Sequence, residues 1–390
     1  MCLRFFNNRQ VRESMIMKIA LLLLIANLGT AYGAGPHRDV VSEVAVFPSS
    51  LVNPSYIGPA HTEQSNLSVF AFTRVTFAQA SFGVEIQPEL RAVQSDRALG
   101  PELRSSVRSP TRLMSLQTKL SSNIKSESTL DLERLNISYR SAGMQLSLGR
   151  RPVSLGVLNV FPVWNKFSRP LVTDYGPLRT FNQDQASVRM QRGEWLVQAL
   201  DIEEQGARKS GATRVAQVSW FGDGVEVHAI GGEWWNSGAL GLAAVTDVAG
   251  TSLKFEEISF SAEAMQMGLG LERAFSDTWS GVTEFMYLES GATDKRDYLL
   301  APASRFRPLS ARAYTFARVD YKPAPLWIIQ FGDLLNLVDS SQLFNIKGLY
   351  SAGNDFELSG EVRLPTGSDD SELSRHVLPV QWILGARYDF

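Results

Sequence analysis

The stretch "LPVQWILGARYDF", residues 378–390, ends the chain with a strict alternation of apolar and mostly polar side chains. Its apolar set, read back from the end, is Phe390, Tyr388, Ala386, Leu384, Trp382 and Val380. A strand turns successive side chains to opposite faces. The stretch therefore predicts a β-strand with one continuous apolar face, closed by an aromatic residue.

The same period of two recurs through most of the chain. It is clear in "RLNISYR" (134–140), "GMQLSLG" (143–149), "ARAYTFARVDYK" (311–322) and "NDFELSGEVRL" (354–364). Apolar side chains occupy one face of each stretch, and Glu, Arg, Gln, Asn or Ser occupy the other. This alternation is the signal of a strand with two different environments. No stretch outside the N-terminal region has a convincing helical period, so the sequence predicts an all-β protein.

The N-terminal region reads as a targeting segment. From Met17 the sequence runs "MKIALLLLIANLGTAYGAG", with a lysine, ten apolar-rich residues and a small-x-small site at 31–33. This pattern is typical of a secretory signal peptide, and the apolar run is about half the ~20 residues that a spanning helix needs. We expect a cleaved leader over 1–33, an N-terminal segment over 34–66 and one β-domain over 67–390. The true start methionine stays open.

Composition excludes several classes of protein. The only cysteine is Cys2, so the expected mature chain has none, and a disulfide-stapled scaffold is excluded. Removing residues 1–33 changes the formal net charge from −2 to −5, which is no footprint for nucleic acid. No nucleophile–base motif and no cysteine–histidine set is recognisable. We therefore predict neither an enzyme nor a metal or cofactor site.

Two architectures fit many alternating strands, namely a secreted sandwich and a membrane barrel. The clearest strands have about 9–13 residues, close to the length that crosses a bilayer at a tilt. The sequence therefore favours a transmembrane antiparallel β-barrel of about 16 strands, with 14 or 18 as alternatives and a further strand open within 34–60. The expected strands are 67–78, 81–94, 112–121, 130–140, 143–151, 184–192, 194–202, 212–220, 225–234, 264–273, 279–288, 312–321, 326–336, 341–350, 354–364 and 380–390.

Two stretches carry a resemblance to known proteins. The closing "VQWILGARYDF" resembles the last strand of Gram-negative outer-membrane porins. That resemblance implies an integral outer-membrane protein, exported through the periplasm, whose Phe390, Tyr388 and Trp382 form the signal read by the barrel assembly machinery. Residues 131–170 are similar to uncharacterised and alginate-porin-like outer-membrane barrels. The matching positions are Gly149, Arg150, Val153, Ser154 and Gly156, while Leu155 replaces the usual tryptophan.

The expected function is a porin-like channel for passive diffusion of small hydrophilic solutes, surrounded by outer-membrane lipids. The alternative is a closed barrel that acts as a structural anchor or binds surface polysaccharide. Residues 152–183 resemble the constriction loop of general porins in position, and the apolar "FPVWNKF" (161–167) would hold that loop against the wall. Whether the protein is a monomer or a homo-oligomer stays open.

Charge indicates mild anion selectivity. Residues 150–183 carry five basic residues against Asp174 alone, and rings of Arg or Lys are the usual device of anion pores. The alternative interpretation of this positive charge is a basic surface loop that binds the phosphates of outer-leaflet lipid. The predicted pore-lining residues are Arg150, Arg151, Lys166, Arg169 and Arg179 of this stretch and Arg134, Arg140 and Arg189 of the neighbouring strands.

Deletion of Phe390 should impair assembly more than stability. A fully buried phenylalanine contributes only ~1.5–3 kcal/mol, and an end residue at the membrane boundary contributes less. If Phe390 is part of an assembly signal, its removal should strongly reduce the amount of folded protein in the outer membrane, measured by fractionation of cells. Normal insertion of the truncated chain would contradict the assembly role.

Overall fold

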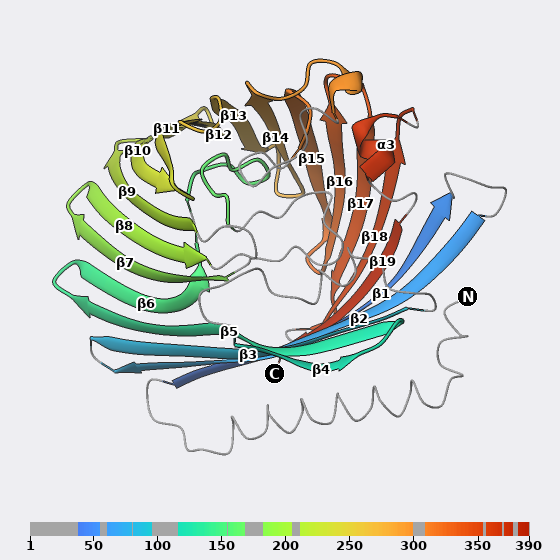
Figure 1. The fold of residues 1–390 in the computed structure, drawn as a ribbon, viewed down its shortest axis with the longest axis horizontal. Coiled ribbons are helices and arrows are strands. Elements are labelled where there is room, and N and C mark those ends of the chain that lie inside the picture. Colours follow the sequence, from blue (N-terminus) through green and yellow to red (C-terminus); the bar gives the residue numbers. More distant parts are fainter. Residues whose placement is uncertain are drawn as a thin grey trace.

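The protein is a β-barrel built from one antiparallel sheet (Figure 1). The computed structural model describes residues 38–54, 61–79, 81–95, 116–153, 155–167, 182–204, 211–298, 309–353, 356–368, 370–376 and 381–389. The strands in these ranges are β1 Arg38–Pro54, β2 His61–Gln79, β3 Phe82–Ser95, β4 Gln117–Ser122, β5 Ser126–Ser141, β6 Met144–Pro152, β7 Asn182–Arg192, β8 Trp195–Glu204, β9 Gly211–Gly222, β10 Val225–Trp234, β11 Ser237–Val248, β12 Thr251–Phe260, β13 Gln266–Ala274, β14 Trp279–Leu288, β15 Ala313–Ala324, β16 Trp327–Asn336, β17 Gln342–Ser351, β18 Phe356–Thr366 and β19 Gln381–Asp389.

The sheet closes where its first and last strands meet. Strand β1 pairs antiparallel with both β2 and β19, so neither β1 nor β19 is an edge. Each later strand pairs with its neighbour in the chain, except around β4. Closure pairs the backbone N–H and C=O groups of the first strand with those of the last. A sheet in lipid must meet this condition, because no water is there to bond an open edge. The predicted transmembrane β-barrel is confirmed, with eighteen full-length strands in the described residues, so the alternative of 18 replaces the expected 16.

Strand β4 is not a wall strand, although 112–121 was predicted as one. It has six residues and pairs only with Asp131–Glu127 of β5, while β3 pairs with β5 from the other side. Strand β6 begins further along the same edge of β5, from Leu135. The β4–β5 hairpin therefore extends this edge beyond β6. Because β4 does not span, β3 and β5 are joined at one rim by a single long connection.

Three wall strands lie outside the predicted set. Strand β1 falls within 34–66, the segment that we expected to precede the barrel. Strands β11 and β12 occupy a region where no strand was predicted. In β11 the inward positions are Ala239, Gly241 and Ala243, while Leu240 and Leu242 point outward, so both faces are apolar. In β12 buried Ile258 and Phe260 also point inward. Another segment of the chain covers this part of the inner wall, so the inward residues are apolar like the outward ones. Apolar and polar residues therefore do not alternate along these two strands.

The outer face of the barrel is an apolar belt. Leu148, Ile137, Leu240, Leu242 and Phe331 are among the most exposed large hydrophobic residues, and they come from strands all around the wall. The residues that alternate with them are buried or polar and face the interior. Such a belt is the lipid-facing surface of a membrane barrel. Among the described residues, no helix has the length and apolar content to cross a membrane.

The two rims of the barrel differ. At one rim, here called the turn rim, tight turns join β5 to β6, β7 to β8, β9 to β10 and β11 to β12. Cross-strand aromatic pairs lie close to it: Trp279 and Tyr321 stack with centroids 4.3 Å apart, and Trp327 and Tyr350 lie 4.6 Å apart. The opposite rim, here called the loop rim, carries the longer connections, the 3-10 turn η2 (Lys295–Asp297) and helix α3 (Glu372–His376).

Candidate functional site

A segment of the chain folds into the barrel between β6 and β7. This inner loop comprises Val153 and residues 155–167, and Figure 1 shows it as a green trace within the ring of strands. Most of its apolar side chains are almost completely buried, including Trp164 at 0% and Val163 at 1% exposure, while Val157 and Val160 are partly buried. The predicted packing of "FPVWNKF" against the wall is therefore observed for the described part of 152–183. Residues 168–181 lie outside the described ranges.

Glu256 of β12 holds the inner loop on both sides of its turn. Its carboxylate is 0% exposed and accepts hydrogen bonds from the backbone N–H groups of Val157, Leu158 (2.7 Å), Val163 (2.9 Å) and Trp164 (3.3 Å). Gly156 has φ +85°, and a Cβ there would overlap the same carboxylate. Four donors on one carboxylate are a strong, charge-assisted tether, so Glu256 fixes the path of the loop.

Glu284 of β14 holds the turn of the loop in the same way. Its two oxygens accept from the backbone N–H groups of Asn159 (2.7 Å), Val160 (2.9 Å) and Phe161 (2.7 Å). Glu284 is 1% exposed. An irregular backbone inside a barrel has donors that no strand can satisfy, and leaving them unpaired would be costly. Together the two glutamates accept from seven of those donors.

Glycines in the wall make room for the side chains of the loop. A Cβ on Gly241 of β11 would lie 2.8 Å from Trp164 Nε1 and 2.6 Å from the Glu257 carbonyl oxygen. Cβ atoms on Gly268 and Gly270 of β13 would overlap Leu158. Trp164 Nε1 donates to the Glu257 carbonyl at 2.7 Å. The side chains of the loop therefore occupy hollows that exist because the wall has glycine at these positions.

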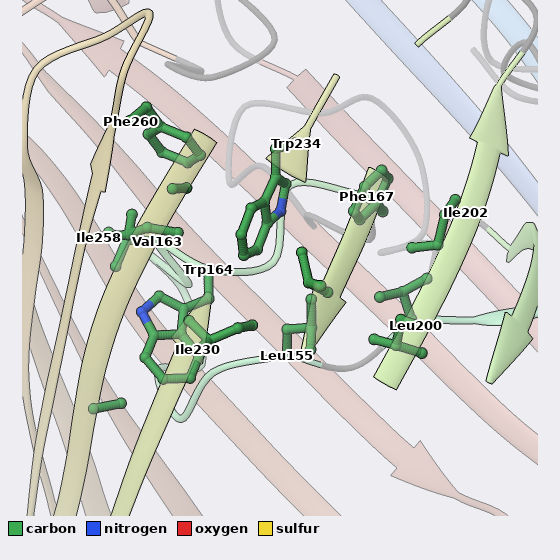
Figure 2. Packing of buried hydrophobic residues seen from close by; sticks show 14 residues of the cluster. Leu155, Val163, Trp164, Phe167, Leu200, Ile202, Ile230, Trp234, Ile258 and Phe260 are labelled. Atoms are coloured by element: carbon green, nitrogen blue, oxygen red, sulfur yellow. The ribbon is translucent and has the colours of Figure 1, made fainter. Parts of the chain in front are cut away.

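Two apolar clusters complete the attachment. Figure 2 shows the first, in which Leu155, Val163, Trp164 and Phe167 of the loop meet inward side chains of β8 to β12. Trp234 and Phe260 form its edge-to-face aromatic pair, with centroids 5.9 Å apart. In the second cluster Phe161 packs on β14 to β17. The inner wall from β8 to β17 is thus largely covered.

The loop rim on this side is closed by a hydrogen-bonded cap. Glu372 of α3 is 3% exposed and accepts from Tyr314 Oη, from Asn336 Nδ2 (2.9 Å) and from the Ser310 backbone (2.6 Å). Leu373 follows it into the second apolar cluster. On the outside of the cap Lys295 Nζ lies 2.7 Å from Asp370 Oδ2 and, with Ser368, holds the pKa of Asp370 at about 2. Asp370 therefore stays ionised at neutral pH.

Two of the residues predicted to line a constriction are buried among partners. Arg150 is 0% exposed; its guanidinium donates to both oxygens of Asp184 (2.8 and 3.1 Å) and to the Leu132 carbonyl (2.8 Å). Lys166 Nζ donates to Gln266 Oε1 at 2.5 Å and lies 5.4 Å from the centre of the Phe260 ring. Both cations are therefore engaged in holding the structure. Arg169 and Arg179 lie outside the described residues.

The other predicted residues gather on the uncovered wall. A cavity of about 330 Å³ is lined by Arg134, Arg140 and Arg151, with Glu85 as its only described acidic residue. Arg134 Nη1 donates to Glu85 at 2.7 Å, and Arg151 Nη1 donates to Ser147 at 2.9 Å. Polar side chains of β2, β5 and β6 complete the lining.

Arg189 extends this basic surface to β7. In the ladders Gln145 of β6 stands opposite both Arg140 of β5 and Arg189 of β7, so the three lie in one row across the wall. Arg151 interacts electrostatically with Arg134, Arg140 and Arg189. We call these four arginines the basic wall. The structure thus brings together four of the eight predicted residues.

The sequence reasoning missed the residues that place the loop. Glu256 falls in a region where no strand was predicted, and Glu284 lies in a predicted strand without having been singled out. A signal was present in the sequence around Glu284, because Val282, Met286 and Leu288 share its face and are all apolar. A single carboxylate among apolar side chains on a buried face needs hydrogen-bond donors close by. In the described residues, no cluster of His, Cys, Asp or Glu is arranged to hold a metal ion.

The residues of the predicted assembly signal lie in the closing strand. Trp382 and Tyr388 belong to β19, where Trp382 stands opposite Val362 of β18 and Ser50 of β1. Phe390 lies outside the described residues. The seam of the barrel is therefore made by the strand that carries the signal, and the assembly role itself stays a prediction.

Comparisons with known proteins identify the fold. No protein-family model matches the sequence, and a search of curated proteins finds no match. Among solved structures, OccK5 (OpdH) from Pseudomonas aeruginosa is similar with a TM-score of 0.59 at 9% identity, over 91% of this chain and 98% of that one. A BenF-like porin from Pseudomonas fluorescens Pf-5 gives 0.57 at 10%, over 92% and 100%.

A third similar structure is OccAB1 from Acinetobacter baumannii, with a TM-score of 0.55 at 11% identity over 92% of this chain and 98% of that one. These likenesses extend over nearly the whole of each barrel, and at such identities they concern the fold. With the apolar outer belt and the closed sheet, they give the chain the fold of an integral outer-membrane porin-like β-barrel.

The variant Glu256→Gln should release the inner loop. Glutamine replaces one acceptor oxygen by an NH₂ group that would face N–H donors, and each lost bond to a charged group costs about 1.5–3 kcal/mol. We expect a larger and noisier single-channel conductance in planar bilayers. Glu361→Gln is the matched control, because Glu361 contacts Arg363 and Asn345 on the wall. Equal conductance of the two variants would refute the tether.

The variant Gly241→Ala should loosen the same contact from the other side. Its Cβ would press on Trp164 and on the backbone of β12, and overpacking of this kind costs about 1–3 kcal/mol. We expect a lower midpoint of unfolding in denaturant and a red-shifted tryptophan emission. Gly348→Ala is the control, since a Cβ there meets nothing within 4 Å. A shift of similar size in both variants would argue against a specific hollow.

Proposed function

We propose that this protein is a passive diffusion channel for small hydrophilic solutes with a mild preference for anions. The observation that carries the proposal is the asymmetry of the inner wall. The inner loop and its apolar clusters cover β8 to β17, whereas β3 to β7 present the basic wall and a polar cavity. A solute path would therefore run between the loop and the basic wall.

Electrostatics support the anion preference. In the cavity three arginines face one described glutamate, and Glu85 is already ion-paired with Arg134 (2.7 Å) and Arg74 (3.4 Å). A narrow lumen with walls of low dielectric constant focuses such an excess of positive charge and raises the local concentration of anions. The preference should be mild, because Asp320, Glu361 and Arg363 on the far wall belong to a mixed set of charges.

Reversal potentials across a bilayer in a salt gradient test this function. The wild-type channel should favour chloride over potassium by about a few-fold, as expected for a pore with arginines on its wall. The variant with Arg134, Arg140 and Arg151 all changed to Gln should lose that preference while it still conducts. Arg296→Gln, an exposed arginine of η2 beyond the wall strands, is the matched control.

Three outcomes would contradict the proposal in different ways. Cation preference of the wild type would refute the anion selectivity. An unchanged preference in the triple variant would show that the basic wall does not set it. Silent bilayers with correctly folded protein would favour the closed barrel that acts as an anchor or binds polysaccharide.

A further inference from the structure

A histidine and a glutamate of β10 face the lumen near the turn rim. Val225 and Val227 are 37% and 40% exposed on the outer belt, so Glu226 and His228, which alternate with them, point inward. Ile230 follows on the same inward face and packs in the first apolar cluster. The tight turn from β9 to β10 ends just before Val225. The two polar residues therefore lie between that turn and the part of the wall that the inner loop covers.

The imidazole of His228 is oriented by its neighbours on β9. Its Nδ1 lies 2.8 Å from Ser219 Oγ, directly across the ladder, and Gln217 Nε2 donates to the same oxygen at 3.0 Å. Ser219 is 1% exposed, so its hydroxyl hydrogen needs an acceptor inside the protein. That acceptor is His228 Nδ1, and the single proton of the neutral imidazole is then on Nε2.

Two polar groups on this face have bonding capacity to spare. His228 is 7% exposed, and its Nε2 has no hydrogen-bond partner. Glu226 Oε2 lies 3.7 Å from this nitrogen, which is beyond hydrogen-bond distance. Within the part of the chain that the structure describes, the Glu226 carboxylate makes no hydrogen bond, and its side chain is 47% exposed. An unpaired buried donor is costly, so the pair is suited to a group that enters from the lumen.

One kind of chemical group satisfies both atoms. A bridging group must accept a hydrogen bond from the Nε2–H of His228 and donate one to the carboxylate of Glu226, and a hydroxyl does both. Two atoms 3.7 Å apart can both lie about 2.8 Å from one hydroxyl oxygen. A carboxylate of a solute would be repelled by Glu226, and an ammonium group has no lone pair for the Nε2–H.

The surroundings extend this contact beyond a single hydroxyl. Phe221 stands opposite Glu226 in the ladder, and its ring meets the His228 ring edge to face, with centroids 5.9 Å apart. On the same inward face Gln198 of β8 stands opposite Gln217 of β9, so amide groups line the next row of the wall. An aromatic ring beside a few polar groups suits a solute that carries both C–H and O–H groups.

We propose that Glu226 and His228 form a subsite for neutral polyhydroxylated solutes, which are sugars or polyols. The proposal rests on the channel function proposed above and adds a second class of solute to it, because the basic wall lies on β5 to β7 and this pair lies on β10. A hydroxyl of the solute bridges Nε2 and Oε2 while its carbon skeleton contacts Phe221. Ser219 is a positioning residue that sets the tautomer. Water competes for the bridge, since it also accepts and donates.

A glucose titration of single channels in KCl at pH 8, where the imidazole is neutral, tests the subsite. Glucose should lower the conductance in a saturable way, beyond the fall that triethylene glycol dimethyl ether causes at matched bulk conductivity. This ether is uncharged and has nearly the mass of glucose, but it offers acceptors without a hydroxyl donor. An equal effect of the two solutes would show that water keeps the bridge and would overturn the proposal.

Substitutions at the two ends of the bridge locate the effect. His228→Phe keeps a ring and removes the donor, and it should raise the half-blocking glucose concentration about tenfold. Glu226→Gln should raise it at least about threefold, because bonds to charged groups are the stronger ones. Ser219→Ala frees the other tautomer and should raise it about threefold. Glu361→Gln is the matched control, since Glu361 is bonded to Arg363 on another part of the wall. An unchanged value in His228→Phe, or an equal rise in the control, would refute the subsite.

Saturation-transfer difference NMR separates failure of the subsite from failure of the channel. The probe is glucose with the purified protein in a zwitterionic detergent that has no sugar headgroup, and heat-modifiability on a gel confirms that each variant is folded. Transfer to glucose that falls in His228→Phe supports the subsite even where bilayers are silent, which would refute the channel alone. Channels that conduct with the expected anion preference, together with no transfer to glucose, would refute the subsite and leave the proposed function standing.

Discussion

The carboxylates of Glu256 and Glu284 are the interaction on which the interior of this barrel depends. A loop that enters a barrel carries backbone donors that no neighbouring strand can satisfy, and buried unpaired donors are costly. Here seven such donors converge on two acids from β12 and β14. Because the acceptors are on the rigid wall, the loop has one path, and the rest of the lumen is left uncovered.

The composition of the wall follows from that attachment. Backbone N–H groups can reach a wall carboxylate only if the loop approaches the sheet closely, so Gly241, Gly268 and Gly270 leave hollows for Trp164 and Leu158. Apolar inward residues of β8 to β17 then bury the remaining surface of the loop. The opposite wall has no such cover and keeps its charges, which are paired locally or gathered as the basic wall. The attached loop and the basic wall thus lie on opposite sides of one lumen.

Sequence patterning predicts the features that depend on local geometry. The closing strand, the period of two and the all-β architecture come directly from the alternation of side chains across a pleated strand. The inward packing of residues 161–167 was also predictable, because a loop with two phenylalanines, a tryptophan and a valine would expose a large apolar surface to water. Alternation does not predict β11 and β12, because the inner loop covers their inner face and apolar residues occupy both faces. It also misleads for β4, whose sequence alternates although the strand does not cross the wall.

Charge is harder to place from sequence than strands are. Arg150 and Lys166 are basic residues in a basic stretch, yet each is withdrawn into a local network with Asp184 or Gln266. Only the register between distant strands decides which cations are neutralised: Arg150 stands opposite Asp184, while Arg140 and Arg189 share a row with neutral Gln145. The number of charges in a loop therefore does not give the field in the lumen.

On both faces of the barrel a polar group needs a hydrogen-bond partner, but the surroundings that can supply one differ between the lumen and the lipid. In the lumen a polar group can be satisfied by the wall, by the loop or by water, so arginines there can stay partly open. On the outer face lipid offers no donors or acceptors, and a polar group has only its neighbours or another protein. A charged side chain on that face is therefore expected to contact a neighbouring strand, as Arg214 of β9 does with Asp201 of β8 at 3.5 Å.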